Sequence, residues 1–137
     1  MREKLKILFV TSEAVPYAKT GGLADVAGTL PKELKKLGHD VRVVMPRYYS
    51  IDKDKYGLKP IAGPLGIPMG ALGEIWCGIY ENNMPNSDVP VYFIEHEHYF
   101  GRSNLYNDDS GQGFLDNDNR FTFLSKASLQ LCKMLDY

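Results

Sequence analysis

Hydrophobic residues lie along the chain in runs whose spacing predicts alternating strands and helices. Residues 5–11 (LKILFVT) form a nearly continuous aliphatic run, which is typical of a parallel strand buried on both faces. Residues 41–45 form a second such run. Between the two runs, apolar side chains recur every three or four positions, the period of an amphipathic helix; they are Leu23, Val26, Ala27, Leu30, Leu34 and Leu37. This order predicts a βαβ crossover.

Glycine and proline mark the limits of this first helix. Gly21 and Gly22 precede the helical spacing, and Gly38 follows it, where glycine commonly ends a helix. Pro31 lies inside the spacing and has no amide hydrogen to donate to the helix. We therefore expect a kink near Gly28, or a helix that restarts there.

The middle of the chain has a different pattern. Residues 57–73 are rich in glycine and proline, residues 73–81 (GEIWCGIYE) alternate in part, and residues 89–95 (VPVYFIE) form another strand-like run. We expect a β-hairpin insertion followed by a return to the main sheet. A long polar loop follows over residues 97–113.

The last predicted element is a helix that begins near residues 116–118, where aspartate can cap it. One face of this helix carries Phe121, Leu124, Ser128, Leu131 and Leu135. A crossover helix normally leads into another parallel strand. We therefore expect residues 1–137 to be one incomplete α/β domain.

Composition is typical of a globular protein and argues against several functions. The chain has 137 residues, of which 44% are hydrophobic, enough for one core. Sixteen Lys and Arg balance 17 Asp and Glu, so no nucleic-acid or membrane surface is indicated. No apolar run approaches the roughly 18 residues that span a bilayer. Cys77 and Cys132 lack metal-ligand spacing, and the N-terminus lacks a signal-peptide cleavage site, so we expect a reducing cytoplasm.

The strongest local candidate for chemistry is residues 19–23 (KTGGL), between the first strand and the first helix. Glycines let backbone amides approach an anion, the helix N-terminus adds about half a positive charge, and Lys19 adds a full one. Open α/β sheets bind ligands at such positions. The segment therefore fits a diphosphate-binding site, and the alternative is a tight turn with an exposed lysine. It matches neither the dinucleotide motif nor the P-loop motif.

Two histidines raise the question of a metal site. His96 and His98 alternate along a predicted strand end, so their side chains share a face. No third ligand lies nearby in the sequence, and ordinary packing is the favoured explanation. We predict neither a metal nor another cofactor.

Several of these segments together resemble the glycogen and starch synthases. The family sequence S-E stands here at residues 12–13, K-x-G-G-L-x-D-V at residues 19–26, and G-x-L-P at residues 28–31. The family's G-H-x-V-x-V-x-x-P-x-Y matches residues 38–48, and D-N-x-x-R-F matches residues 116–121. The resemblance covers essentially the whole chain in the same order.

The resemblance implies a Rossmann-like parallel sheet that forms the N-terminal half of a GT-B glycosyltransferase, with the active site between two facing domains. The full-length enzyme would transfer glucose from ADP-glucose to the non-reducing end of an α-1,4-glucan, with retention of configuration. It would work in the cytoplasm without a cofactor. Because the C-terminal nucleotide-sugar-binding domain is absent, we expect residues 1–137 to be inactive alone.

The resemblance also assigns residues to the donor. Lys19 would lie beside the phosphates of ADP-glucose, with Thr20, Gly21 and Gly22 around the same charge and Tyr106 near the nucleotide. As the glucosyl bond breaks, negative charge grows on the leaving ADP, and fixed donors aimed at that charge stabilise the transition state.

Two acidic residues, Glu13 and Asp25, match family positions that line the cleft and contact sugar hydroxyls. Each has a simpler explanation: Asp25 lies in the first helical turn, where it interacts favourably with the helix dipole, and Glu13 is equally explained as a solvated loop residue. A retaining glycosidase needs two carboxylates about 5 Å apart. The sequence does not fix that distance, so we assign no nucleophile.

Two other functions stay open at this point. One is another GT-B glycosyltransferase, of the sucrose- or trehalose-forming type. The other is a non-catalytic domain that binds glucan or a partner protein. The combination of K-x-G-G-L-x-D-V with D-N-x-x-R-F favours the synthase.

Overall fold

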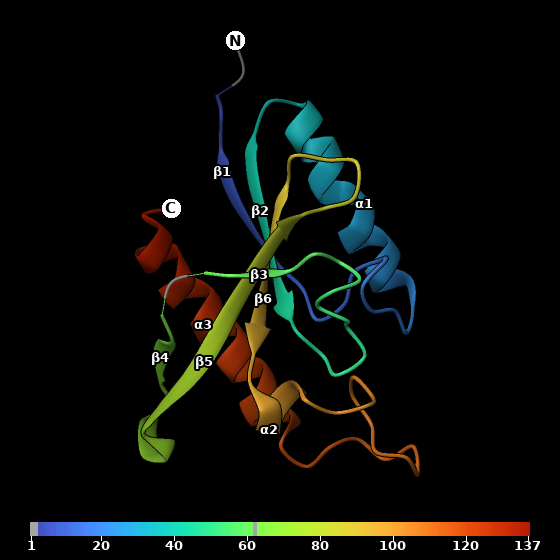
Figure 1. The fold of residues 1–137 in the computed structure, drawn as a ribbon, viewed down its shortest axis with the longest axis vertical. Helices are drawn as coiled ribbons and strands as arrows, with labels where there is room; N and C mark the ends of the chain where they lie inside the picture. The colour runs from blue at the N-terminus through green and yellow to red at the C-terminus, as the bar shows by residue number, and fades with distance from the viewer. Residues whose placement is uncertain (1–2, 62) are drawn as a thin grey trace.

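The computed structural model describes residues 3–61 and 63–137, and in these residues a mixed six-stranded sheet forms the centre of the molecule (Figure 1). The order along the sheet is β1-β2-β6-β5-β3, and β4 pairs with β5. The strands are β1 (Lys6–Val10), β2 (Asp40–Pro46), β3 (Lys59–Pro60), β4 (Leu65–Pro68), β5 (Glu74–Asn83) and β6 (Pro90–Glu95). The helices are α1 (Gly22–Lys36), α2 (Glu97–Phe100) and α3 (Asn117–Leu135), with a 3-10 turn η1 at Gly70–Leu72.

The predicted βαβ crossover is confirmed. β1 and β2 run parallel, in register from Lys6 opposite Asp40 to Val10 opposite Val44, and α1 connects them. β6 adds a third parallel strand beside β2, with Val43 opposite Val91. The three carboxyl ends therefore lie at one edge of the sheet, and the loops that follow these strands gather there.

The prediction that the first strand is buried on both faces is wrong. β1 lies at the edge of the described sheet and pairs with β2 alone. Its burial is only partial, and Val10 at its end is 40% exposed. The aliphatic run resembles that of a central strand, but β2 and β6 occupy the central positions and are the more deeply buried strands.

The predicted hairpin is present as β4 and β5, but it is part of the main sheet. β5 pairs antiparallel with β4, from Leu65 opposite Cys77, and also antiparallel with β6, from Gly78 opposite Glu95. One long strand thus joins the hairpin to the parallel strands. The sheet is therefore mixed: the three parallel strands are those of the predicted Rossmann-like sheet, and the hairpin insertion adds the antiparallel ones.

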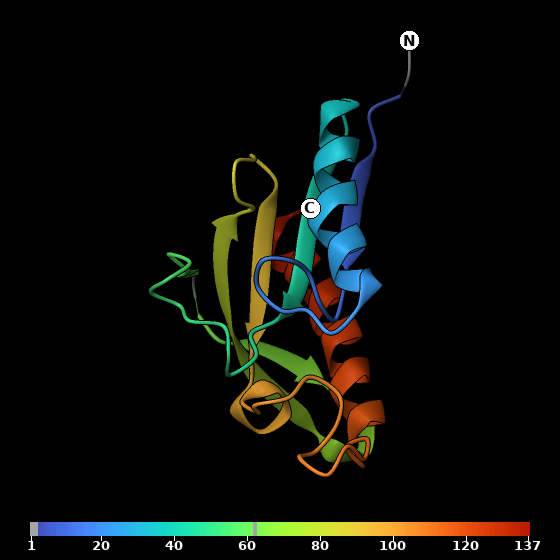
Figure 2. The same ribbon diagram turned by 90° about the vertical axis from the view of Figure 1, so that its right-hand side faces the viewer.

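The two long helices cover opposite faces of the sheet (Figure 2). α1 packs on β2 from one side, and α3 packs on β2 and β4 from the other. The core contains Phe93, Met45 and Phe123, all fully buried. Among the described residues, no helix has both the length and the apolar composition needed to cross a bilayer.

Only part of the apolar stripe predicted for α1 faces the sheet: Ala27 is buried and Leu34 packs against the core. The buried residues of α1 are Ala24, Ala27, Gly28 and Pro31, whereas Leu23, Val26 and Leu30 are 41–52% exposed. The reason is the close approach of the helix to the loop after β1, where the Val15 amide donates to the Ala24 carbonyl at 3.0 Å. Small residues permit that approach, and larger aliphatic ones do not.

Pro31 does not interrupt α1. The helix is a single element from Gly22 to Lys36, and Pro31 is buried within it. The restart near Gly28 that the sequence suggested therefore does not occur.

Candidate functional site

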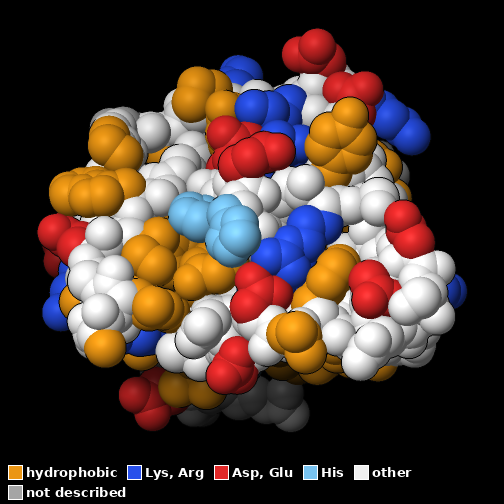
Figure 3. Space-filling model, turned by 90° about the horizontal axis from the view of Figure 1, so that it is seen from below, with side chains coloured by type: hydrophobic (Ala, Val, Ile, Leu, Met, Phe, Trp, Pro, Cys, Tyr) orange, Lys and Arg blue, Asp and Glu red, His pale blue; other side chains and the backbone are white. Residues whose placement is uncertain are grey.

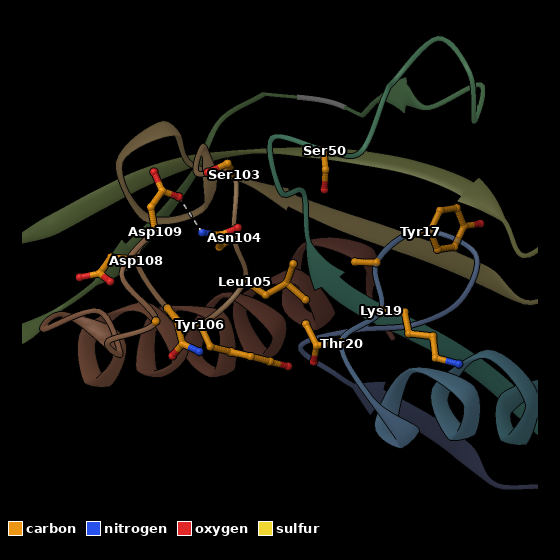
Figure 4. Close-up of a pocket in the computed structure, with 13 residues that line it drawn as sticks. Tyr17, Lys19, Thr20, Ser50, Ser103, Asn104, Leu105, Tyr106, Asp108 and Asp109 are labelled. Atoms are coloured by element: carbon orange, nitrogen blue, oxygen red, sulfur yellow. Dashed lines mark hydrogen bonds between the residues drawn. The ribbon is translucent and has the colours of Figure 1, made fainter.

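A pocket of about 840 Å³ lies at the carboxyl edge of the parallel strands. One wall comes from residues 17–20, after β1, and the opposite wall from residues 103–109, after α2 (Figure 4). Ser50, from the loop after β2, also lines it. Figure 3 shows this end of the molecule, where acidic, basic and histidine side chains are intermixed.

Glu13 connects the two walls of this pocket. Its side chain is buried, with the residue only 2% exposed. The carboxylate accepts hydrogen bonds from the Thr20 amide at 3.2 Å, the Thr20 hydroxyl at 2.6 Å, the Gly21 amide at 3.0 Å and the Tyr106 hydroxyl at 2.6 Å. The carboxylate thus closes the loop after β1 and joins it to the loop that carries Tyr106.

The hydrogen bonds also set the ionisation of both partners. Burial alone acts to raise the pKa of Glu13, but the bonds from Thr20, Tyr106 and Gly21 outweigh it and hold the pKa below its ordinary value. Burial and the bond to Glu13 raise the pKa of Tyr106 to about 12. At neutral pH Glu13 is therefore an anion, and Tyr106 is a neutral phenol that donates to it.

This arrangement changes what the glycine turn offers to an anion. The sequence pointed to the amides of the turn as donors to a ligand, but the Thr20 and Gly21 amides donate to Glu13. Gly21 is the N-cap of α1 and supplies no side-chain cap. The first amides of a helix have no partner within it, and the Ala24 amide already donates to the Gly21 carbonyl at 3.2 Å. The amides of Gly22 and Leu23 are therefore the ones that the helix itself does not use. A Cβ at Gly21 or Gly22 would meet nothing within 4 Å, so this turn is open to a ligand.

Lys19 and Asp25 form an exposed ion pair at the start of α1. The ammonium lies 3.0 and 2.9 Å from the two carboxylate oxygens of Asp25. Both side chains are about half exposed, at 52% and 57%. Figure 4 shows the Lys19 side chain directed toward α1, on the opposite side of the pocket from Asp109. A pair this exposed is weakly bound, so either partner is available to a ligand.

The structure thus brings all the sequence-predicted site residues to one end of the molecule. Lys19, Asp25 and Gly22 lie at the start of α1, and Glu13 connects Thr20 and Gly21 to Tyr106. Their roles toward a ligand stay predictions.

Arg120 belongs to the site although sequence reasoning gave it no role. Its side chain is fully buried. The guanidinium donates to the Tyr99 carbonyl at 2.6 Å, to the Leu105 carbonyl at 2.8 Å and to the Asn117 side-chain oxygen at 2.7 Å. The sequence carried a signal, because Arg120 lies four residues before Leu124 on the buried face of α3. A charged residue at such a position is retained only when polar partners meet it.

Tyr106 is fixed by this end of α3. The Asn117 side-chain amide and the Phe114 backbone amide both donate to the Tyr106 carbonyl at 3.0 Å. The Phe121 ring lies 5.8 Å from the Tyr106 ring, and Arg120 holds the preceding carbonyl, that of Leu105. Two residues of the D-N-x-x-R-F segment, Asn117 and Phe121, therefore contact Tyr106 itself. A third, Arg120, contacts Leu105 next to it.

Asp116 occupies the N-cap position of α3 but does not cap it, contrary to the sequence expectation. Its side chain makes no cap hydrogen bond. The carboxylate instead pairs with Arg102 through two bonds of 2.8 and 2.6 Å. That ion pair joins the two ends of the loop that forms the second wall of the pocket.

The loop after β2 is tied into the same network. The buried Tyr48 hydroxyl donates to the Ser12 carbonyl at 2.6 Å, and the Ser12 and Tyr106 hydroxyls lie 2.6 Å apart. Segments after β1, β2 and α2 are therefore linked through hydrogen bonds around one buried carboxylate. The sequence motifs contained both Ser12 and Tyr48, but nothing in the sequence indicated that their side chains would meet around Glu13.

The two histidines do not form a metal site in the described residues, where no three His, Cys, Asp or Glu side chains gather as ligands. His96 accepts a hydrogen bond from the Tyr99 amide at 3.2 Å and caps α2, as a residue that shapes the loop. Burial lowers the pKa of His96. His98 is largely exposed and lies 3.8 Å from Asp116.

Comparison with known proteins gives one consistent result. Residues 6–137 match the model of the starch synthase catalytic domain. The chain is 59% identical to glycogen synthase 1 of Geobacter metallireducens over 98% of its own length and 27% of that protein's length. It is 49% identical to the glycogen synthase of Treponema denticola, over 94% and 26% of the two lengths.

A solved structure is similar as well. The catalytic domain of starch synthase IV from Arabidopsis thaliana, bound to ADP and acarbose, superposes with a TM-score of 0.82 at 27% identity, over 98% of this chain and 26% of that one. The chain thus spans about a quarter of the length of the curated relatives and of this structural neighbour.

Proposed function

The chain belongs to the starch synthase catalytic domain family, and from that premise we propose that it forms the N-terminal side of the active-site cleft of a glucan synthase. The reaction proposed is transfer of glucose from ADP-glucose to the non-reducing end of an α-1,4-glucan. A second domain of the GT-B type would supply the facing side of the cleft. The two free cysteines, Cys77 and Cys132, fit a cytoplasmic enzyme.

One observation carries the proposal: the pocket at the carboxyl edge combines Lys19 on one wall with hydroxyl, amide and carboxylate side chains on the other. Lys19 and the N-terminus of α1 complement a diphosphate on one side. On the other side Asn104 and Tyr106 both donate and accept hydrogen bonds and Asp109 accepts them, as sugar hydroxyls require. A volume of about 840 Å³ lies within the usual range for a small-molecule site.

Lys19 is the group that we propose contacts the leaving diphosphate. When the donor binds, the Lys19 ammonium leaves Asp25 and pairs with a phosphate oxygen. The freed Asp25 carboxylate then accepts a hydrogen bond from a sugar hydroxyl. In this proposal the Gly22 and Leu23 amides, which α1 itself does not use, donate to the same phosphate. Because negative charge on ADP is greatest as the glucosyl bond breaks, these groups stabilise the transition state more than the ground state.

Glu13 has a different role in this proposal, because its carboxylate is buried and accepts four hydrogen bonds. It holds the glycine turn in the conformation that presents α1 to the pocket, and it holds Tyr106 opposite that turn. No residue of this chain is assigned as a nucleophile.

The test is a comparison of Lys19→Ala with Lys36→Ala. Both variants remove an exposed 2.9 Å ion pair from α1, since Lys36 pairs with Glu33 at the far end of the helix. We expect Lys19→Ala to weaken binding of ADP-glucose by about tenfold or more, the effect of losing one charge-assisted contact. Lys36→Ala should bind as the unaltered chain does.

The affinities are measured by nuclear magnetic resonance titration with ADP-glucose and UDP-glucose. Shift changes at Lys19, Gly22 and Tyr106 would locate the donor in the pocket. Equal affinity in the two lysine variants would contradict the proposal. Tighter binding of UDP-glucose would favour a glycosyltransferase of the sucrose- or trehalose-forming type.

A further inference from the structure

We propose that a second carbohydrate-binding surface, centred on Trp76, holds an α-glucan chain beside the candidate site. Trp76 is the single tryptophan of the sequence, it lies on β5, and it is 56% exposed. A large aromatic side chain left this exposed on a strand has an apolar face available to a ligand. This proposal rests on the proposed function only for the choice of an α-glucan as the ligand.

Two glycines neighbour Trp76 in the sheet, and neither places a side chain beside the indole. Gly66 lies opposite Trp76 on β4, and a Cβ there would lie 3.1 Å from the indole carbon Cη2. Gly78 lies two residues along β5 on the same face, where the nearest atom to an added Cβ would be 3.7 Å away. The indole therefore packs close to the backbone of β4, and on the side toward β6 the next side chain is that of Glu95, opposite Gly78.

Hydrogen-bonding groups surround this aromatic surface without an excess of charge. Trp76 lines a hollow of about 700 Å³ together with Arg47, Lys53, Glu95, Glu97 and His98. Glu95 pairs with both Arg47 and Lys53 at 2.9 Å. Figure 3 shows the same intermixing of charge over this end of the molecule.

The chemistry of these groups fits a neutral sugar better than an anion. The two cations already share a carboxylate, so they offer little net positive charge to a phosphate. A sugar ring presents apolar C–H groups on one side, which pack on an aromatic face, and hydroxyls at its edge, which need both donors and acceptors. Glu97 and His98 supply such groups beside Trp76.

The Trp76 surface continues into the candidate site, which points to a polymer as the ligand. Arg47 and Lys53 also line a neighbouring hollow with Tyr49 and Ser50. Ser50 in turn lines the pocket that contains Lys19 and Tyr106. Adjacent hollows that share lining residues allow one chain of several glucose units to contact both ends, which raises its affinity over that of a single unit.

The single tryptophan makes a direct test possible, because all tryptophan emission reports on this surface. Titration of the 137-residue chain with maltoheptaose should give a saturable change in emission, and maltose should bind at least about tenfold more weakly. Affinity electrophoresis in gels containing glycogen gives a second readout. There Trp76→Ala should lose about tenfold or more in affinity, and Trp76→Phe should keep part of it. Leu129→Ala, which removes a 64% exposed side chain from α3, is the matched control and should be retarded as the unaltered chain is.

Failure of this proposal is distinguishable from failure of the donor site. Lys19→Ala should change the affinity for ADP-glucose and leave the emission response to maltoheptaose unaltered. Absence of an emission change with maltoheptaose, or equal retardation of Trp76→Ala and the unaltered chain, would overturn the Trp76 surface. The surface would also be overturned if the Trp76 emission changed with protein concentration in the absence of glucan. Such a change would show that a second copy of the chain covers Trp76.

Discussion

At the scale of single residues, Glu13 organises the site through its charge. Its carboxylate accepts four hydrogen bonds, and these lower its pKa despite burial. A folded-state pKa below the unfolded value means that ionised Glu13 stabilises the folded state. That contribution is complete above the unfolded pKa of about 4.5 and is lost as the pH falls through the folded-state pKa.

The corresponding prediction concerns Glu13→Gln. The amide group puts a donor where Thr20, Gly21 and Tyr106 already donate, so we expect a loss of about 2–3 kcal/mol in unfolding free energy at pH 7. We also expect stability to fall less between pH 7 and pH 3 than in the unaltered chain. Urea unfolding at each pH measures both effects.

The other carboxylates with lowered pKa values titrate in both proteins; they are Glu95, Asp108 and Asp116. The difference between the two pH profiles therefore isolates Glu13. Glu33→Gln is the control, because Glu33 forms an exposed ion pair with Lys36. It should change the free energy of unfolding by no more than about 0.5 kcal/mol. Parallel pH profiles for Glu13→Gln and the unaltered chain would show that Glu13 is not ionised in the folded state.

At the scale of secondary-structure elements, Gly28 determines how closely α1 approaches the loop after β1. A Cβ at this position would lie 2.3 Å from Val15 Cγ2 and 2.9 Å from the Val15 carbonyl oxygen. We expect Gly28→Ala to destabilise the fold by about 1–3 kcal/mol, because the helix or the loop must move. Gly22→Ala, where an added Cβ meets nothing within 4 Å, should be neutral or slightly stabilising. Thermal unfolding of both variants measures this, and equal melting temperatures would contradict it.

The start of α3 is the second element that determines the site. Arg120 holds the Tyr99 and Leu105 carbonyls, which lie on either side of the loop turn before Tyr106. Lysine has the charge but not the planar set of donors, so we expect Arg120→Lys to loosen this loop. Hydrogen exchange should quicken about tenfold or more at residues 104–108 and stay unchanged in β2 and β6. Uniform quickening throughout the sheet would instead indicate that Arg120 serves global stability alone.

The sequence predicted the elements better than their faces and pairings. Periodicity located α1, α3 and the parallel strands, because local spacing reports which segments bury apolar side chains. It was right for Ala27 of α1 but wrong for Leu23 and Val26, which stay exposed because alanine, glycine and proline pack closest there. It also predicted that the first strand is buried on both faces, whereas β1 lies at the edge, because strand order is set by contacts distant in the sequence.

For the site, the motif resemblance named Lys19, Glu13 and Tyr106 as members of one group, and the structure brings them together. Sequence reasoning did not find that Glu13 accepts the turn amides or that Arg120 supports Tyr106. Both relations join residues that lie far apart in the sequence and depend on burial. A single sequence shows residue types and spacing, whereas it does not show which buried polar groups satisfy one another.

At the scale of the whole molecule, the exposure of the candidate site predicts what the chain does alone. Lys19 and Asp25 keep about half of their side-chain surface in contact with solvent, so a bound diphosphate would stay partly hydrated. Electrostatic stabilisation of a leaving group is weak in water and strong where water is excluded. Neither condition for fast transfer, a closed cleft or donors on both sides of the diphosphate, is met by the described residues.

We therefore expect the purified 137-residue chain to bind ADP-glucose and glucan weakly and to transfer no glucose. The measurement is incorporation of labelled glucose from ADP-glucose into glycogen, with binding of both ligands followed in the same samples. Binding without transfer would agree with a chain that supplies one side of a cleft, because orientation and charge stabilisation both need the facing side. Turnover by the chain alone would show instead that Lys19 and the start of α1 suffice for catalysis.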